Sequence, residues 1–310
     1  MTTSAASGTA LRHEALFYRD AEECTAVVGD FVSEALDAAR PVLAVISGER
    51  AEGLAARLGQ AWQDVEVVDM AALGRNPSRI IPAFRSFLEE NEGGEVSVVG
   101  EPIWPGRSAA EIAEATRHEA LINNALADTS VHALCPYQLD VLDAAVIADA
   151  YRTHPVVRVD GRREPSQSFT DPQLVWRSVA HLPTAAPHCR TVDFDMTRLS
   201  AVREAVRAEA RVAGVSEGRA DDLVVATSEV VGNSIRHGGG GGVLRTWLDA
   251  QGVVCEVRDR GEITDPLVGR RRPDPAAEGG WGLWLANQLC DLVQLHTDAA
   301  GTTVRLHMAR

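Results

Sequence analysis

The N-terminal half of the chain alternates short apolar runs with longer segments whose apolar residues recur at helical spacing. Apolar runs of strand length lie at residues 41–47, 65–70, 96–100 and 131–135. Helical patterns fill the intervals at residues 21–39, 50–62, 78–90, 109–127 and 139–150. This alternation predicts an α/β domain with a mostly parallel sheet covered by helices. Ligands of such sheets usually sit beyond the carboxyl ends of the strands.

The pattern changes between residues 160 and 190. Prolines recur in this polar stretch, and only residues 174–180 read as a short helix. We therefore place a domain junction here. The predicted organisation is a first domain over residues 10–160, a linker over 161–190 and a second domain over 191–310.

The second domain opens with a predicted strand and a predicted helix and then alternates the two element types less regularly. Predicted strands cover residues 191–196, 253–259 and 301–306, and predicted helices cover 199–213, 223–237 and 283–293. A glycine run starting at residue 238 and an extended apolar run follow the second helix. The pattern predicts an α+β sandwich, with one mixed sheet under a layer of helices.

Composition narrows the classes of protein that fit. The chain has 30 basic and 44 acidic residues and a formal net charge of -14. This excludes a general affinity for nucleic acid or for an anionic membrane, since both require a positive surface. The five cysteines have neither zinc-ligand nor redox-motif spacing, so we expect reduced core thiols and a cytoplasmic location. The first ten residues lack a signal-peptide pattern, and no apolar run is long enough to span a membrane.

Three polar residues share one stripe of the predicted helix at residues 223–237. Glu229, Asn233 and His237 are spaced at i, i+4 and i+8. A carboxylate, an amide and an imidazole in line can serve a metal ion and a nucleophile. A solvated polar face is the alternative explanation of the stripe.

Asp259 ends the apolar face of the predicted strand 253–259, and Gly261 follows two residues later. A carboxylate at that place is costly unless it meets a donor. In one interpretation, Asp259 accepts the exocyclic amine of adenine while Gly261 leaves room for the ring. A plain turn also explains Asp-x-Gly.

Candidate phosphate contacts come after this turn. The loop at residues 262–279 carries three consecutive arginines, which suit either a lid over phosphates or a solvated surface. Gly280 and Gly282 open the next helix, where free backbone N–H groups attract an anion. Thr302 presents a hydroxyl beside the same core face as Asp259.

The first domain carries the remnant of a nucleotide loop. Gly48 and Gly53 follow a predicted strand with the spacing of a phosphate-binding loop. That loop needs Lys for the terminal phosphates and Ser or Thr for Mg²⁺. Leu54 and Ala55 occupy those two positions, so we expect no nucleotide hydrolysis there.

Several short segments of residues 10–160 resemble the MEDS sensory domain, which is recombinase-like in fold and is implicated in sensing small ligands. They are HEALFY from His13, GRNP from Gly74, GEPIWPGRS from Gly100, RHEAL from Arg117 and CPY from Cys135. The resemblance implies a sensor role, but the residues of these segments do not indicate a particular reaction or ligand.

The order of the motifs after residue 190 resembles the ATP-binding domain of the GHKL superfamily, most closely anti-sigma-factor serine kinases of the RsbW type. The whole chain thus resembles an RsbA-family anti-sigma regulator. The resemblance implies that Asn233 holds Mg²⁺ on ATP and that Glu229 is the general base. It implies that Asp259 and Gly261 recognise adenine, with support from Thr302. Gly280 and Gly282 are implied to line the site of the phosphates. These role assignments are what the resemblance implies.

The implied function is an ATP-dependent regulator that sequesters a sigma factor and phosphorylates Ser or Thr of a STAS-type anti-anti-sigma partner. The resemblance also implies a homodimer through the ATPase domain. Two alternatives stay open. One is a non-catalytic, ATP-gated adaptor. The other is a histidine autokinase that uses His118 of the RHEAL segment.

Overall fold

The computed structural model describes residues 10–178, 182–276 and 279–310, and these form two compact units. The N-terminal unit comprises the described residues up to Gly74 together with Ile80–Arg177, and the C-terminal unit comprises Arg75–Arg79 and Ser178–Arg310. Three expectations lie partly outside the described residues. They concern the start of the chain, the end of the predicted helix 174–180, and two residues of the loop 262–279.

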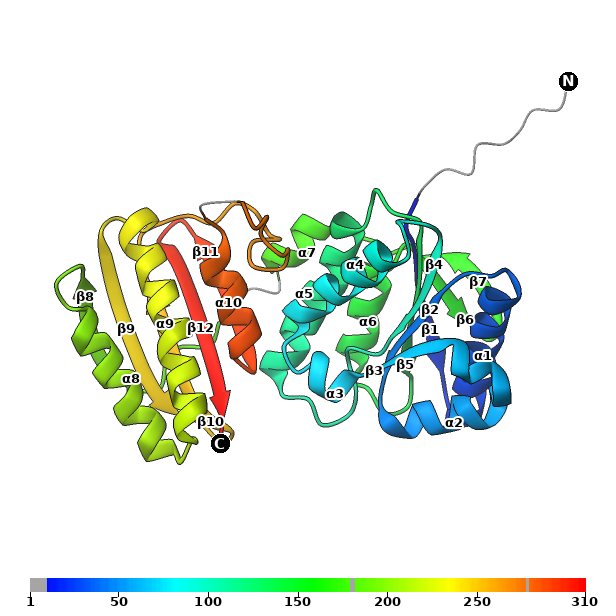
Figure 1. Cartoon of the computed structure of the whole chain (residues 1–310), viewed down its shortest axis with the longest axis horizontal. Helices are drawn as coiled ribbons and strands as arrows, with labels where there is room; N and C mark the ends of the chain where they lie inside the picture. Colours follow the sequence, from blue (N-terminus) through cyan, green and yellow to red (C-terminus); the bar gives the residue numbers. More distant parts are fainter. Residues whose placement is uncertain (1–9, 179–181, 277–278) are drawn as a thin grey trace, which may run out of the picture. The chain divides into compact units, whose positions relative to one another are not determined.

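The N-terminal unit contains a seven-stranded sheet in the order β3-β2-β4-β5-β1-β6-β7 (Figure 1). All neighbours pair in parallel except β6 and β7, which are antiparallel. The mostly parallel sheet is therefore confirmed. The strands are β1 (Arg12–Tyr18), β2 (Val42–Ile46), β3 (Val65–Asp69), β4 (Val96–Gly100), β5 (Val131–Gln138), β6 (Val156–Val159) and β7 (Arg162–Pro165).

Helices connect these strands much as the periodicity predicts. They are α1 (Ala21–Asp37), α2 (Gly48–Leu58), α3 (Met70–Leu73), α4 (Ile80–Glu90), α5 (Ala109–Ala125), α6 (Ala144–Thr153) and α7 (Pro172–Ser178), with 3₁₀ turns η1 (Gly59–Asp64) and η2 (Pro77–Arg79). The helix predicted at 139–150 starts five residues too early, because β5 continues to Gln138 and α6 begins at Ala144. Strand β7 and helix α7 lie within the stretch that the sequence assigns to a linker.

The pattern analysis does not predict strand β1, because charged residues interrupt its apolar run. Glu14 lies in this strand with a fully buried side chain. Burial raises its pKa, but hydrogen bonds with His132 and Arg158 outweigh that effect and lower the pKa to about 2. Arg163 donates a third bond to the carboxylate at 2.9 Å. A buried carboxylate with this many donors is compatible with a core strand.

The C-terminal unit contains a five-stranded sheet in the order β11-β12-β10-β9-β8. Every pair in it is antiparallel, so the predicted mixed sheet is wrong. Two consecutive helices connect β8 to β9, and the chain returns beside β8 in the opposite direction. The elements are β8 (Arg190–Asp195), α8 (Leu199–Ala213), α9 (Glu217–His237), β9 (Gly241–Leu248), β10 (Gly252–Arg258), α10 (Trp281–Leu289), β11 (Leu292–Asp298) and β12 (Gly301–Ala309).

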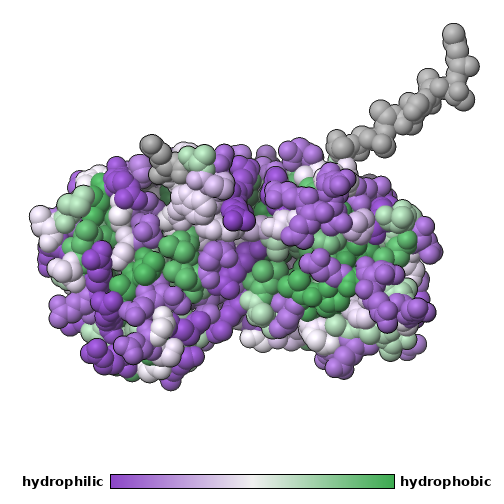
Figure 2. Space-filling view, viewed as in Figure 1, coloured by the Kyte–Doolittle hydropathy of each residue, from purple (hydrophilic) through white to green (hydrophobic). Residues whose placement is uncertain are grey.

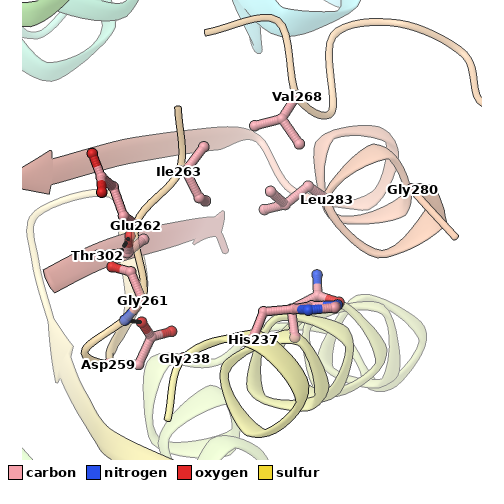
Figure 3. A pocket seen from close by; sticks show the side chains of 11 residues that line it. His237, Gly238, Asp259, Gly261, Glu262, Ile263, Val268, Gly280, Leu283 and Thr302 are labelled. Carbon is pink, nitrogen blue, oxygen red and sulfur yellow. Dashed lines mark hydrogen bonds between the residues drawn. The ribbon is translucent and has the colours of Figure 1, made fainter. Parts of the chain in front are cut away.

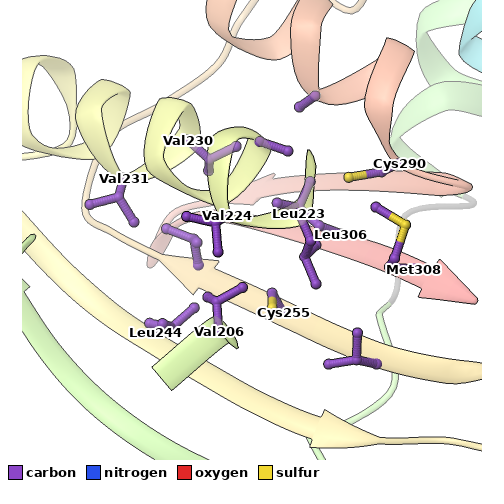
Figure 4. Close-up of a cluster of buried hydrophobic side chains, with 14 of the residues drawn as sticks. Val206, Leu223, Val224, Val230, Val231, Leu244, Cys255, Cys290, Leu306 and Met308 are labelled. Atoms are coloured by element: carbon purple, nitrogen blue, oxygen red, sulfur yellow. The ribbon is translucent and has the colours of Figure 1, made fainter. Parts of the chain in front are cut away.

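The helices α8, α9 and α10 cover one face of this sheet, so the α+β sandwich is confirmed (Figure 1). Figure 4 shows their apolar side chains meeting those of the strands, among them Leu223 from α9 and Leu306 from β12. Cys255 of β10 is in the same core, whereas its neighbour Glu256 bonds Arg245 and Arg305. The alternation along β10 thus separates an apolar face from a paired polar face. This packing fixes the ends of α9 and β10, where the candidate site lies.

Polar side chains cover much of the face shown in Figure 2, with apolar groups between them in both units. Large exposed apolar side chains occur on several elements, including Val67, Leu174, Val212 and Trp281. Within the described ranges, no helix combines the length and the apolar character that a membrane crossing requires.

Candidate functional site

A pocket of about 400 Å³ opens in the C-terminal unit, between the end of α9, the start of α10 and the chain after β10 (Figure 3). Five predicted site residues line it, namely Asn233, Asp259, Gly261, Gly280 and Thr302. The remaining lining residues are His237, Gly238, Glu262, Ile263, Val268 and Leu283. The structure therefore brings residues separated by up to 69 positions of sequence to one cavity.

The two other predicted residues, Glu229 and Gly282, do not line the pocket but lie close to Asn233. A Cβ atom built on Gly282 would come within 2.8 Å of Asn233 Nδ2 and 3.2 Å of Glu229 Oε2. The side chains of Asn233 and Glu229 are half-buried on α9, and Gly282 lies in the first turn of α10. The missing side chain of Gly282 is therefore what lets the two helices approach at this point.

Asn233 has its carboxamide oriented by a neighbour. Arg236 Nη2 donates to Asn233 Oδ1 at 2.8 Å, from one helical turn along α9. An amide oxygen beside a carboxylate is a ligand type that Mg²⁺ accepts. His237 lies at the end of the same stripe, with an exposed side chain that lines the pocket.

Asp259 follows β10 directly, and the local backbone fixes its carboxylate. Oδ1 accepts the backbone N–H of Gly261 at 2.7 Å. Gly238 approaches from the end of α9, so closely that a Cβ there would lie 2.4 Å from Asp259 Cγ. Within the described part of the chain no donor bonds Oδ2 of this carboxylate. Asp259 thus presents one unused acceptor oxygen in a half-buried position.

Thr302 closes the turn that carries Asp259. Its hydroxyl donates to the Gly261 carbonyl oxygen at 2.9 Å and lies 3.1 Å from the Thr297 hydroxyl. Asp259 and Thr302 also exchange two backbone hydrogen bonds, of 3.0 and 3.2 Å. Thr302 therefore supports the Asp-x-Gly turn through both its backbone and its side chain.

Gly280 is the N-terminal cap of α10 and has a φ of 90°, a conformation that side chains rarely adopt. Among the residues that the structure describes, no side chain caps this helix, so its first N–H groups suit an anion. The loop before it is partly packed, because the Gly269 carbonyl oxygen accepts from Asn287 of α10 at 2.9 Å. Of the three arginines in this loop, Arg270 is buried, whereas Arg271 and Arg272 are exposed.

Two regions of the chain match known families. Residues 192–308 match the family described as Histidine kinase-like ATPase domain, and residues 12–155 match MEDS, the MEthanogen/methylotroph, DcmR Sensory domain. The chain pairs a MEDS sensory domain with a histidine kinase-like ATPase domain.

One solved structure similar to the chain contains the RsbU and RsbW domains of Rv1364c from Mycobacterium tuberculosis, with 19% identity and a TM-score of 0.30. The similarity covers 66% of this chain and 49% of the Rv1364c chain. The present chain therefore spans about half the length of the Rv1364c chain in that structure. No curated protein matches the chain.

The polar groups at the glycine loop of residues 48–53 are engaged within the N-terminal unit. Ser47 caps helix α2, and its side chain accepts the N–H of Arg50. The Arg50 guanidinium binds Glu101 at 2.6 and 2.8 Å and the Tyr18 hydroxyl at 2.7 Å. Arg50, which lies within this loop, is therefore already paired, and Leu54 is fully buried in the core.

The pattern analysis does not predict several residues of the ATPase pocket. Ile263, Val268 and Leu283 form apolar walls (Figure 3), but the first two lie in a polar loop with no periodicity. Gly238 was recognised only as the start of a glycine run. Its close approach to Asp259 depends on how α9 and β10 pack, which no local pattern encodes.

Proposed function

We propose that the ATPase domain binds ATP with Mg²⁺, and that the chain is an anti-sigma regulator controlled by its MEDS domain. The supporting observation is the convergence of Asp259, Asn233 and Gly280 on one cavity, with Glu229 behind Asn233. A carboxylate, an amide and a helix N-terminus are the groups that an adenine, a magnesium ion and phosphates require.

Adenine is expected at the Asp259 end of the pocket. The exocyclic amine donates to Asp259 Oδ2, while Gly261 leaves space for the ring and Thr302 holds the turn. Ile263, Val268 and Leu283 offer apolar surface of the kind that lines nucleotide pockets. Guanine presents a carbonyl in place of that amine, and two acceptors facing each other repel. Selectivity for ATP over GTP follows.

The phosphates are expected at the other end, near Gly280 and the first N–H groups of α10. Asn233 Oδ1 would hold Mg²⁺, which neutralises phosphate charge when bound. Gly282 keeps the path clear of a side chain. In this proposal Glu229 accepts the proton of an attacking hydroxyl. Its carboxylate is half-buried and, like the Asn233 amide, lies next to Gly282 at the start of α10.

The resemblance to RsbW-type kinases favours a hydroxyl on a protein as the acceptor. We propose that the chain sequesters a sigma factor and transfers phosphate to Ser or Thr of a STAS-type anti-anti-sigma partner. A homodimer through the ATPase domain and a cytoplasmic location accompany this proposal, with no direct contact to nucleic acid or membrane. The buried position of His118, at 0% exposure, argues against histidine autophosphorylation.

The test combines partner capture with label transfer. Proteins co-purifying with the full chain from its native host are identified by mass spectrometry, then incubated with it and γ-labelled ATP·Mg²⁺. Acid-stable label on a STAS-type protein is the expected result. Acid-labile label on the chain itself would contradict the proposal in favour of a histidine kinase. ATP binding without any label would favour the ATP-gated adaptor.

A further inference from the structure

Four side chains that can bind a metal converge in the core of the MEDS domain, whereas the ATPase pocket belongs to the other unit. They are His13 of β1, Glu119 of α5, Cys135 of β5 and His154 at the end of α6. One donor atom from each lies within 4.8 Å of the donor atoms of the other three. All four residues are at most 2% exposed.

The separations within the cluster are those expected around a single small ion. His154 Nε2 lies 2.8 Å from Glu119 Oε2, and His13 Nε2 lies 3.3 Å from the same oxygen. Cys135 Sγ lies 3.5 Å from His13 Nε2. Ligands about 2.0–2.3 Å from a tetrahedral zinc ion are separated from one another by similar distances.

The outer nitrogen of each histidine is committed as a donor. Asn123 uses its amide N–H groups on three backbone carbonyl oxygens, so its Oδ1, which lies 3.2 Å from His13 Nδ1, acts as an acceptor. His154 Nδ1 lies 2.9 Å from the Ala150 carbonyl oxygen. Both imidazoles therefore direct an Nε2 lone pair toward the Glu119 carboxylate, which is the tautomer that metal-binding histidines adopt.

This arrangement is unfavourable without a cation. Two imidazole lone pairs facing a buried carboxylate repel one another. Protonating one ring would still leave the lone pair of the other facing Glu119 Oε2, and protonating both would place two positive charges in rings whose centroids are 4.1 Å apart.

We propose that His13, Glu119, Cys135 and His154 bind one divalent transition-metal ion of the zinc class. The donor set of two imidazoles, a thiolate and a carboxylate suits zinc in tetrahedral geometry. The ion displaces the thiol proton to solvent on binding. Thiolate and carboxylate then balance its two charges, so the buried site is neutral. The metal ties β1 and β5, which are adjacent strands, to α5 and α6.

Elemental analysis of the untagged full chain tests the proposal. Protein from zinc-supplemented cells, dialysed in metal-free buffer, should retain one zinc per chain, and this should fall at least tenfold in Cys135→Ser. Cys24→Ser is the matched control, because Cys24 is also a buried thiol of the same unit but lies outside the cluster. Retention of zinc in Cys135→Ser would overturn the ligand set, and wild-type protein without zinc would overturn the site.

Spectroscopy on the wild type keeps the test independent of how the variants fold. Zinc-edge X-ray absorption should show one sulfur at about 2.3 Å and nitrogen or oxygen ligands at about 2.0–2.1 Å. Cobalt exchanged for zinc should give a thiolate charge-transfer band and tetrahedral d–d bands. A shell of nitrogen and oxygen only, or octahedral cobalt without a charge-transfer band, would contradict the assignment.

Discussion

Gly282→Ala is a test of how closely α10 must approach the end of the pocket where we propose that magnesium binds. The added Cβ would lie 2.8 Å from Asn233 Nδ2 and 3.2 Å from Glu229 Oε2, so the Asn233 amide must move. That amide is the end of a flexible side chain, and Ala is favoured over Gly in helices by up to about 1 kcal/mol. We therefore expect a folded protein with a displaced magnesium ligand.

The magnitude follows from the contact that is lost. A hydrogen bond or similar contact to a charged group contributes about 1.5–3 kcal/mol, which corresponds to a roughly 10–100-fold weaker affinity for ATP·Mg²⁺. Calorimetric titration measures the affinity, and thermal denaturation checks the fold. Gly218→Ala on α9 is the matched control, because a Cβ there meets nothing within 4 Å. Equal ATP affinities in the wild type, Gly282→Ala and Gly218→Ala would refute the placement of phosphates and magnesium beside Asn233.

Three further predictions concern other parts of the chain. Asp259→Asn should weaken ATP binding by about 10–100-fold, because the charged acceptor is lost, and equal ATP and GTP affinities of the wild type in calorimetry would argue against adenine at this residue. Glu14 has a folded-state pKa of about 2 against a usual 4.5, so its stabilising effect is complete above pH 4.5 and is lost as the pH falls toward 2. Denaturant unfolding across that range should therefore show about 2 kcal/mol more acid destabilisation in the wild type than in Glu14→Gln, a value discounted because the partner Arg163 is exposed to solvent. A fragment of residues 10–178 should show no ATP binding in calorimetry, because Leu54 and Ala55 replace the phosphate and magnesium ligands of its glycine loop; micromolar affinity would contradict this.

Periodicity predicted the elements whose apolar residues follow one clear spacing. The core strands β2 and β4 and the helix α8 are examples. Strand β1 is not predicted, because its buried charged residue finds its partners on other strands. Glu14 becomes compatible with a core only once Arg158 lies beside it.

The prediction of a helix over residues 283–293 failed for a different reason. The segment has the apolar residues of both α10 and the first part of β11 with no proline or glycine between them. In the structure α10 ends at Leu289 and β11 starts at Leu292, which pairs with His307 of β12. Pairing with a strand that follows later in the chain overrides the local helical pattern.

The two clusters of functional groups differ in how visible they are in sequence. The ATPase residues lie on ordered motifs, so their convergence was predictable from a resemblance. The MEDS cluster draws Cys135 from one strand and His13 from another, 122 positions apart. Cysteine spacing alone indicated reduced core thiols without a metal. The possibility of a metal site arises only when β1 and β5 pair in register.

The central claim is that Glu229 acts as the general base in phosphate transfer. One measurement tests this claim most directly. The assay follows single-turnover transfer of labelled phosphate from ATP·Mg²⁺ to the captured partner by Glu229→Gln, with Asn233→Ala in parallel. Glu229→Gln keeps the side-chain size beside Gly282 and removes only the base, so ATP should bind near wild-type strength while transfer slows about 10²–10⁴-fold. Asn233→Ala should lose both binding and transfer. Transfer at the wild-type rate by Glu229→Gln would contradict the account.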